Sequence, residues 1–189
     1  MITLNENALC TRANVKDFLQ VVAVNNDIDD LINQTINRVS TMFETYCGRS
    51  FNSATFTEYI DGGGQWLFPK NTPITSVTSI NEDSEWSWGS DTLISDSTYR
   101  IADNNGIYYE SIFIRGIQSI KLVYIGGYET LPEDVIQASI TEVSRIIKHR
   151  VDFDVLTVNR DDGTVQYTSY DYLPLTLKTL KSYRLQYVI

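Results

Sequence analysis

The chain has 189 residues, of which 42% are hydrophobic and 21% charged, and its formal net charge is −9. This balance is typical of one globular domain, or of a core with a sizeable insertion, and it excludes general disorder. The charge is uneven, because residues 56–110 contain nine acidic side chains and only two basic ones. Tight binding of DNA requires lysines and arginines that neutralise phosphates, so this middle part is excluded as a DNA grip. It is interpreted as a solvated acidic face, or alternatively as a wall that repels DNA.

The sequence contains no targeting or membrane segment that we can identify. No stretch approaches 18 continuous apolar residues, and the first ten residues lack the basic start and apolar run of a signal peptide. We therefore expect a protein that is made and kept in a cytoplasm and spans no membrane. Cys10 and Cys47 are too few and too far apart for a disulfide framework or a metal site. Cys47 ends an apolar helix stripe and is interpreted as a small buried hydrophobe.

Two helices are predicted before residue 50. The first covers residues 11–24, and either Thr11 or Asn14 can cap it. Asp27 is then expected to cap a longer helix that ends at Gly48, a natural stop just past a C-terminus. One side of this longer helix is apolar, which predicts a single buried face. The residues of that side are Ile28, Leu31, Ile32, Ile36, Val39, Phe43, Tyr46 and Cys47.

From residue 51 the pattern changes to β-branched and aromatic residues in period-two segments, which are typical of strands. Strands are predicted over residues 55–60, 65–68, 74–80, 99–102, 106–109, 111–114 and 119–125. The run Asp-Gly-Gly-Gly at 61–64 predicts a hairpin turn. The polar segment 82–97 is expected to be an exposed loop or a short edge hairpin. If it is extended, Trp86 and Trp88 lie on one face.

The clearest helix is predicted over residues 131–150. Thr130 and Glu133 match a capping box, and Pro132 suits the first turn. An apolar stripe must pack on something, and it consists of Ile136, Ile140, Val143 and Ile147.

Beyond this helix, residues 151–172 have no strong period, and the turn at 161–163 predicts either a small hairpin or a mobile loop. A last, basic helix is predicted over residues 174–187. Its aligned residues are Leu173, Leu177, Leu180, Arg184 and Tyr187.

No catalytic residue, metal site or cofactor is predicted. His149 is the one histidine, so a catalytic triad or a histidine-rich metal site is excluded within the chain. We interpret it as a partner of the negative end of a helix dipole. Glu58 and Asp61 could be a carboxylate pair for glycoside hydrolysis. Because acidic pairs on surface strands are common, we predict that the protein is not an enzyme.

Three stretches, taken in order, carry a family resemblance. They are FETYCGRSF at 43–51, EYIDGGGQWLFPKNTPITSVTSI at 58–80, and SIKLVYIGGYETLPEDVIQASITEVSRIIKHR at 119–150. Together with the opening helix they resemble the phage head–tail connector family, whose members are also called adaptor proteins. The β-rich part resembles the larger variety of this family, which has an inserted β module.

The resemblance implies a structural virion protein without enzymatic activity or cofactor. Members of the family assemble as a ring, usually twelve-fold, beneath the portal after DNA packaging, where they extend the DNA channel and present a surface to the next tail-proximal protein. For this chain it therefore implies a homo-oligomeric ring in the virion neck, built in the host cytoplasm from subunits that can stay monomeric until they meet the portal. The implied partners are the portal protein and the next head-completion or tail protein, and packaged DNA passes without specific binding.

We therefore predict an α+β fold with a helical core at 11–50 and 128–189 and an inserted antiparallel β module at 54–126, together one connector domain over 1–189. The last helix is basic and amphipathic, as in helix-in-groove docking. Its predicted portal-docking residues are Leu177, Leu180, Lys181 and Arg184.

Trp86 and Trp88 are predicted to contact the tail side or a neighbouring subunit, because Tyr and Trp are enriched at interfaces. Two alternatives stay open. One is another tail-completion protein, and the other is a cytoplasmic module that binds a sugar or peptide with Trp86 and Trp88.

Overall fold

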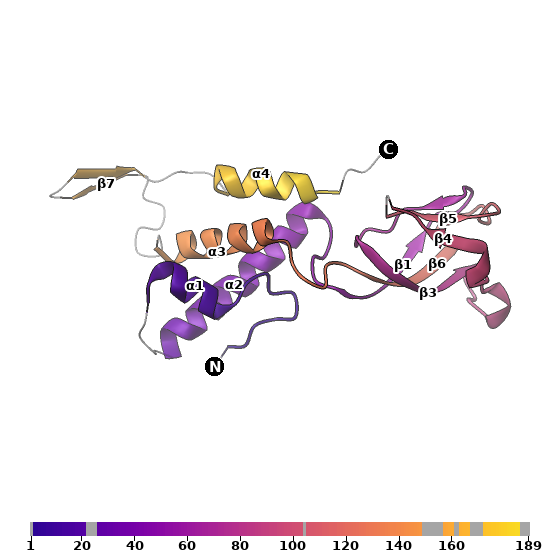
Figure 1. Ribbon diagram of the computed structural model, residues 1–189, viewed down its shortest axis with the longest axis horizontal. Coiled ribbons are helices and arrows are strands. Elements are labelled where there is room, and N and C mark those ends of the chain that lie inside the picture. The colour runs from indigo at the N-terminus through magenta and orange to yellow at the C-terminus, as the bar shows by residue number, and fades with distance from the viewer. Residues whose placement is uncertain are drawn as a thin grey trace. The chain divides into compact units, whose positions relative to one another are not determined.

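The structure is a computed structural model that describes residues 2–21, 26–103, 105–148, 157–160, 163–166 and 172–185. The chain divides into two compact units. The helical unit consists of Met1–Gly48 and Leu131–Ile189, and the β unit consists of Arg49–Thr130. Figure 1 shows helices in the first and antiparallel strands in the second. The predicted α+β fold, a helical core with an inserted antiparallel β module, is confirmed. That the two units act as one connector domain stays a prediction.

The first helix, α1 (Arg12–Leu19), begins where the sequence predicts. The Thr11 hydroxyl accepts a hydrogen bond from the Asn14 amide at 3.2 Å, and the Asn14 side chain accepts one from the Thr11 amide at 3.1 Å. This is a capping box with asparagine in the third position. The predicted extension of the helix to residue 24 is wrong, because Gln20 adopts a left-handed φ of 57° and ends it. Residues 22–25 lie outside the described part.

The second helix, α2 (Asn26–Cys47), includes Asp27 in its first turn, so the prediction that Asp27 is its cap is wrong. The predicted stop at Gly48 is confirmed. Gly48 has a φ of 71°, and its amide donates to the Glu44 carbonyl at 2.8 Å, which is how glycine closes a helix C-terminus. The apolar stripe of α2 forms much of the helical core through Ile32, Ile36, Val39, Phe43 and Cys47.

The third helix, α3 (Glu133–Lys148), packs against the three other described helices, as Figure 1 shows. Its first turn closes on the Pro132 carbonyl, which accepts from the amides of Val135 and Ile136 at 3.0 and 3.1 Å. The predicted cap at Thr130 is therefore wrong by two residues. His149 lies outside the described part.

The buried face of α3 is rotated from the predicted stripe. Ile140 and Val143 are buried as expected, but Ile136 and Ile147 are half-buried at the edge of the face. The centre of the face also contains polar side chains, so apolar period alone misplaces it. The buried residues are Val135, Ala138, Ser139, Ile140, Glu142, Val143 and Ser144.

The buried carboxylate of Glu142 positions the last helix, α4 (Pro174–Tyr183), whose start is marked by Leu173 as N-cap. One carboxylate oxygen pairs with the guanidinium of Arg145, and the other accepts the Leu173 amide at 3.4 Å. A negative charge at the start of a helix also interacts favourably with the positive end of the helix dipole. Glu142 thus ties α3 to the N-terminus of α4.

The far end of α4 is tied to α2. The Cys47 thiol donates to the Leu180 carbonyl at 3.5 Å, and the Cys47 carbonyl accepts the Leu185 amide at 3.0 Å. The predicted burial of Cys47 is confirmed. The helix ends at Tyr183, earlier than predicted, because Arg184 is extended with ψ at 132°. Residue 187 lies outside the described part.

The β unit contains two three-stranded antiparallel sheets. Their strands are β1 (Ala54–Ile60), β6 (Ile120–Gly126) and β3 (Ile74–Glu82) in one sheet, and β2 (Trp66–Leu67), β5 (Ile107–Tyr109) and β4 (Tyr99–Ile101) in the other. Two short 3-10 turns, η1 (Ser90–Thr92) and η2 (Asp96–Thr98), follow β3. The predicted strand at 111–114 is wrong. The Phe113 amide and carbonyl instead bond to the glycine turn, with Gly64 and Gly63, at 2.9 and 3.0 Å.

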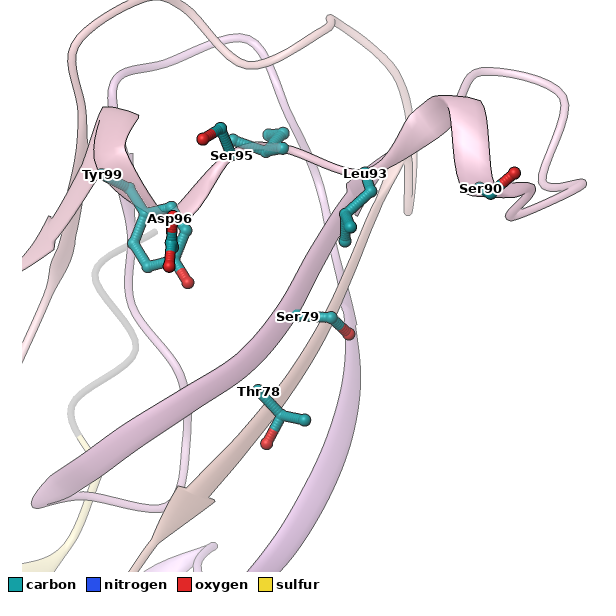
Figure 2. Close-up of a pocket in the computed structure, with 8 residues that line it drawn as sticks. Thr78, Ser79, Ser90, Leu93, Ser95, Asp96 and Tyr99 are labelled. Carbon is teal, nitrogen blue, oxygen red and sulfur yellow. The ribbon is translucent and has the colours of Figure 1, made fainter.

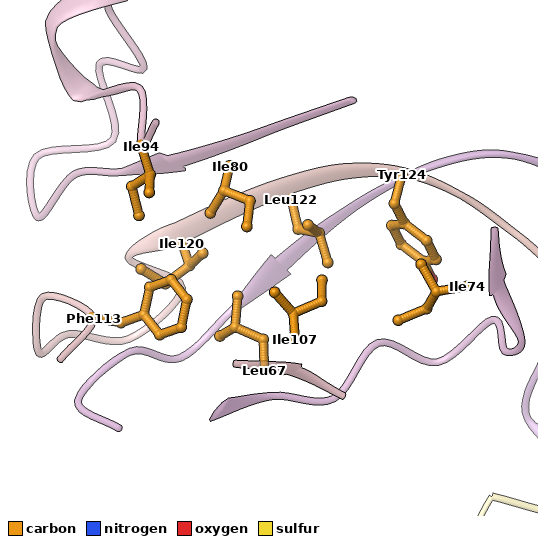
Figure 3. Packing of buried hydrophobic residues seen from close by; sticks show 9 residues of the cluster. All are labelled: Leu67, Ile74, Ile80, Ile94, Ile107, Phe113, Ile120, Leu122 and Tyr124. Atoms are coloured by element: carbon orange, nitrogen blue, oxygen red, sulfur yellow. The ribbon is translucent and has the colours of Figure 1, made fainter. Parts of the chain in front are cut away.

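The core of the β unit lies between its two sheets. Strand β6 alternates between buried and half-buried residues, as an amphipathic strand does. In Figure 3 the side chains of Ile120, Leu122 and Tyr124 point toward Leu67 and Ile107 of the other sheet. The full cluster adds Ile74, Ile80, Ile94 and Phe113. This packing decides which residues of each strand face outward.

For residues 151–172 the sequence left a hairpin or a mobile loop open. Strands β7 (Thr157–Arg160) and β8 (Gly163–Gln166) pair as antiparallel partners, with Arg160 opposite Gly163, which confirms the hairpin. None of the helices in the described ranges is both long enough and apolar enough to cross a membrane.

Replacement of Glu142 by alanine is expected to lower the free energy of unfolding by about 3 kcal/mol, because Arg145 and the Leu173 amide lose a buried acceptor. Urea denaturation followed by circular dichroism measures the change. Gln137→Ala, at an exposed position of the same helix, is the control and should stay within about 0.5 kcal/mol of wild type. Equal stability of the two variants would contradict a role of Glu142 in holding α4.

Candidate interaction surfaces

The two carboxylates considered for hydrolysis are both engaged in the fold. Glu58 accepts the Tyr124 hydroxyl at 2.5 Å and the Lys70 amide at 3.2 Å, and Asp61 accepts the Gln118 amide at 2.7 Å. Burial, followed by the hydrogen bond to Glu58, raises the pKa of Tyr124 far above its ordinary value. The hydroxyl therefore stays protonated and donates. Both carboxylates order loops, and within the described ranges no cluster of three or more potential metal ligands occurs.

A pocket with a volume of 530 Å³ lies beside β3. In Figure 2, Thr78 and Ser79 of the strand line one side, and Asp96 and Tyr99 lie across from them. Its lining is Thr78, Ser79, Ser90, Leu93, Ile94, Ser95, Asp96 and Tyr99. Burial, and then the charge of Asp96, raise the pKa of Tyr99. The pocket offers hydroxyl groups and one carboxylate but no positive group that would recognise a phosphate.

A cluster of aromatic side chains covers the outer side of the β2-β5-β4 sheet. Trp66 pairs with Tyr108 across the strands, while the next pair, Leu67 and Ile107, points into the core. Alternation therefore turns Trp66 and Tyr108 outward. The rings of Trp66 and Phe68 stack with centroids 6.0 Å apart, and those of Trp66 and Tyr108 lie 5.1 Å apart. We call Trp66, Phe68 and Tyr108 the aromatic face.

A second exposed group, which we call the apolar tip, consists of Trp86, Ile112, Ile114 and Ile117. These side chains are 59%, 64%, 40% and 76% exposed. The Trp86 indole N–H donates to the Ile117 carbonyl at 3.2 Å, which joins the two loops. Ile112 and Ile114 flank Phe113, which is buried in the core. Four large exposed apolar side chains on adjoining loops indicate an interaction surface.

Three carboxylates hold the backbone of the apolar tip. Glu82 accepts the Ile114 amide at 3.0 Å, and Asp61 accepts the Gln118 amide. Asp83 accepts the Ser87 hydroxyl at 2.5 Å and the amides of residues 85, 87 and 88 at 2.7, 2.8 and 3.1 Å. The Ser87 hydroxyl and then the Glu85 amide lower the pKa of Asp83 to about 2. The tip is therefore ordered before any partner binds.

The extended conformation that would place Trp86 and Trp88 on one face is not formed. Their φ angles are 59° and 52°, so the segment is a turn and not an extended strand. Trp88 is half-buried, with its ring 5.6 Å from that of Tyr59, whereas Trp86 is exposed. The paired indole platform that a sugar- or peptide-binding module would use is not formed. A contact of Trp86 and Trp88 with the tail side or a neighbouring subunit stays a prediction.

The four residues predicted to dock on a portal do not share one exposed face. Leu180 is 0% exposed and Leu177 is half-buried, so both hold α4 on its own unit. Lys181 and Arg184 are exposed, and the Arg184 guanidinium lies 5.4 Å from the ring centre of Tyr46. The outward face instead contains Leu175, which is 75% exposed, and Lys178. Helical spacing of three residues from Leu175 to Lys178 to Lys181 was the available sequence signal.

Comparison with known proteins identifies the fold and the family. The sequence model of the family described as head completion protein matches residues 8–185. No curated protein matches the chain. Solved structures with this fold include chains in the neck of an empty gene transfer agent (GTA) particle computed with C6 symmetry, in the neck of a native GTA particle computed with C12 symmetry, and in the virion of a native GTA particle. Their TM-scores are 0.64, 0.60 and 0.63, at 13%, 13% and 14% identity. Each match covers 100% of this chain and 95% of the other.

The pKa of Asp83 provides a test of how the apolar tip is ordered. Because its folded value of about 2 lies below the ordinary 3.8, the carboxylate stabilises the folded tip above pH 3.8, and this contribution is lost as the pH falls through about 2. Ser87→Ala is expected to raise the pKa of Asp83 toward 3.8, since the Ser87 hydroxyl is the main cause of the shift. An NMR titration of the Asp83 carboxyl carbon measures this.

Ser84→Ala is the matched control, because Ser84 is exposed in the same turn and should leave the titration of Asp83 unchanged. An Asp83 that titrates at its ordinary value in the wild-type chain would contradict the described hydrogen bonds.

Proposed function

Because the chain belongs to the head completion protein family, we propose that it is a structural, non-enzymatic subunit of a phage neck. In this proposal its copies form a ring under the portal, twelve-fold symmetric in the particle, which extends the DNA channel and provides the surface for tail attachment. The subunit is made in the host cytoplasm and resides in the virion neck. Its partners are the portal protein, the next head-completion or tail protein, and further copies of itself.

The distribution of exposed apolar residues is the observation that carries this proposal. Of the twelve large hydrophobic side chains that are exposed in the described part, nine belong to the β unit. They are Tyr59, Trp66, Phe68, Trp86, Leu93, Ile101, Ile112, Ile114 and Ile117. Apolar exposure of this extent is costly for an isolated subunit and is typical of surfaces that become buried on assembly. Subunits of permanent assemblies bury such surfaces against their neighbours.

The fold likeness supports a ring. Chains of this fold occur in GTA necks computed with C6 and C12 symmetry. A ring of identical subunits needs head-to-tail contacts between two different patches on each copy, closed by rotation. The aromatic face and the apolar tip are exposed patches that contacts with further copies or with other neck proteins would bury.

The charge of the chain suits a channel for DNA. Residues 56–110 contain nine acidic side chains and two basic ones, so this part of the β unit offers few groups that neutralise phosphates. Contacts that neutralise phosphates would hold the DNA in place. Packaged DNA therefore passes without specific binding in this proposal.

For portal docking we retain the exposed end of α4, with Lys181 and Arg184 as the contacting residues. Leu177 and Leu180 hold this end of α4 in place, because their side chains pack inward. In this proposal the two positive side chains complement an acidic groove on the portal, and the helix fits into that groove. This assignment narrows the four predicted residues to two that a partner can reach.

The ring is tested by adding the purified chain to the portal protein of the same particle and imaging the mixture by electron microscopy. We expect a second ring stacked on the portal, with the same rotational symmetry in both. Portals that remain bare at saturating concentrations of the chain would contradict the proposed function.

Replacement of both Lys181 and Arg184 by glutamate is expected to weaken binding to the portal about tenfold, since two charge reversals at an exposed contact cost about 1.4 kcal/mol. Surface plasmon resonance with immobilised portal measures the affinity. Arg38→Glu, at an exposed position on α2, is the control. If the control weakens binding as much as the double variant, the effect is one of net charge and not of this site.

A further inference from the structure

The apolar tip has an acidic surround that indicates the chemistry of its partner. Glu85 is exposed in the loop of Trp86, and Glu110, whose carboxylate lies 3.9 Å from the Arg100 guanidinium, is exposed just before Ile112. Arg115 is an exposed basic side chain between Ile114 and Ile117, so the surround is acidic in balance rather than throughout. Asp83 is ionised at neutral pH because its pKa is lowered to about 2. A matching surface has an apolar centre and a positive rim. Because carboxylates outnumber Arg115 around the tip, the surround disfavours anionic lipid and nucleic acid, and a protein surface is the favoured partner.

The tip is also rigid enough to bind without a large ordering cost. Trp86 is fixed by its indole hydrogen bond to Ile117, and the backbone around Ile114 is fixed by Glu82. The Ser119 hydroxyl additionally shares its hydrogen between the carbonyls of Ile114 and Gly116, at 2.9 and 3.1 Å. Preorganised side chains lose less conformational freedom on association. Because the exposed side chains of the tip are already fixed in the free subunit, they favour a specific contact.

The outward face of α4 has the complementary composition. Leu175 is 75% exposed, and Lys178 and Lys181 follow it at spacings of three residues. Residues 172–185 contain no acidic side chain. This face therefore presents an apolar centre with positive charges beside it, which is what the tip requires.

We propose that the apolar tip of one copy docks on the outward face of α4 of the next copy, around Leu175 and Lys178. The proposal rests on the proposed function, because a ring requires a contact between two different patches. Trp86 and Ile117 pack on Leu175, and Lys178 pairs with the carboxylates around the tip. The end of α4 at Lys181 and Arg184 remains accessible to the portal, so one helix serves two contacts.

Engineered disulfides test this contact with little background, because Cys10 and Cys47 are both buried. We would prepare Ile117→Cys and Leu175→Cys singly and together, and oxidise each sample after assembly on the portal of the same particle. A mixture of the two single variants should give a disulfide-linked dimer, and the double variant a ladder of oligomers. Each single variant alone should stay monomeric on non-reducing gels.

The matched control pairs Ile117→Cys with Phe18→Cys, at a 46% exposed apolar position of α1, and should give no cross-link. Rings that form on the portal without an Ile117–Leu175 cross-link overturn the docking proposal and leave the proposed function standing. Dimers of Ile117→Cys alone, or a bond within one double-variant chain, also overturn it. Bare portals with every variant and with wild type overturn both proposals.

Charge reversal is a second measurement, independent of oxidation. Glu85→Lys and Lys178→Glu should each reduce the fraction of portals that bear a complete ring, about threefold at limiting concentration. A chain with both changes should recover, because the pair is restored with opposite polarity. Loss that simply adds in the double variant would overturn the pairing.

Discussion

The hydrogen bond from a backbone amide to a carboxylate is the interaction on which the ordered loops of this protein depend. Asp83 accepts three amides in the turn of Trp86, and Glu82 accepts that of Ile114. Glu142 does the same at the start of α4. Charge-assisted bonds of this kind are stronger than bonds between neutral groups. Much of the acidic surplus of the chain is therefore engaged in holding its connections in place.

This use of carboxylates changes how the net charge is interpreted. An acidic composition is usually taken as a surface property that maintains solubility. Here Asp61 and Glu82 have structural partners, yet they still contribute negative charge around the apolar tip. The same residues thus order the tip and determine which partners it attracts. A neutral substitute such as asparagine would retain some hydrogen bonds and lose the second effect.

Features that depend on neighbouring residues could be predicted from the sequence, and those that depend on distant partners could not. The stop at Gly48 and the start at Thr11 are local, because their hydrogen bonds span three or four residues. The strand at 120–126 shows its buried face through alternation. By contrast, the buried Glu142 is explained by an amide 31 residues away. No periodicity in α3 contains that information, so the apolar stripe predicts Ile136 and Ile147 at the centre of the buried face, whereas they lie at its edge.

The interaction surfaces show the same division. A pattern of alternating residues would have placed Trp86 and Trp88 together, but the Asp83 carboxylate draws the chain into a turn that separates them. The sequence pattern of α4 predicts Leu177 and Leu180 as partner contacts, because an amphipathic helix does not reveal which side faces its own core. Only the packing of α4 on α2 and α3 decides this. Burial depends on tertiary packing. It therefore separates the residues that stabilise the subunit from those that a partner protein can contact.

An exposed apolar surface on a rigid tip raises the question of how free subunits avoid self-association through identical tips. Two tips that met face to face would bring together the carboxylates of Asp83 and Glu85 on both copies, and like charges in contact are unfavourable. The helical face around Lys178 has the opposite sign, so only a contact between unlike surfaces gains from both apolar burial and charge. A contact between unlike surfaces propagates from copy to copy, whereas a contact between like surfaces stops at a dimer. The acidic surround of the tip therefore favours the proposed ring over a pair of copies joined by like tips.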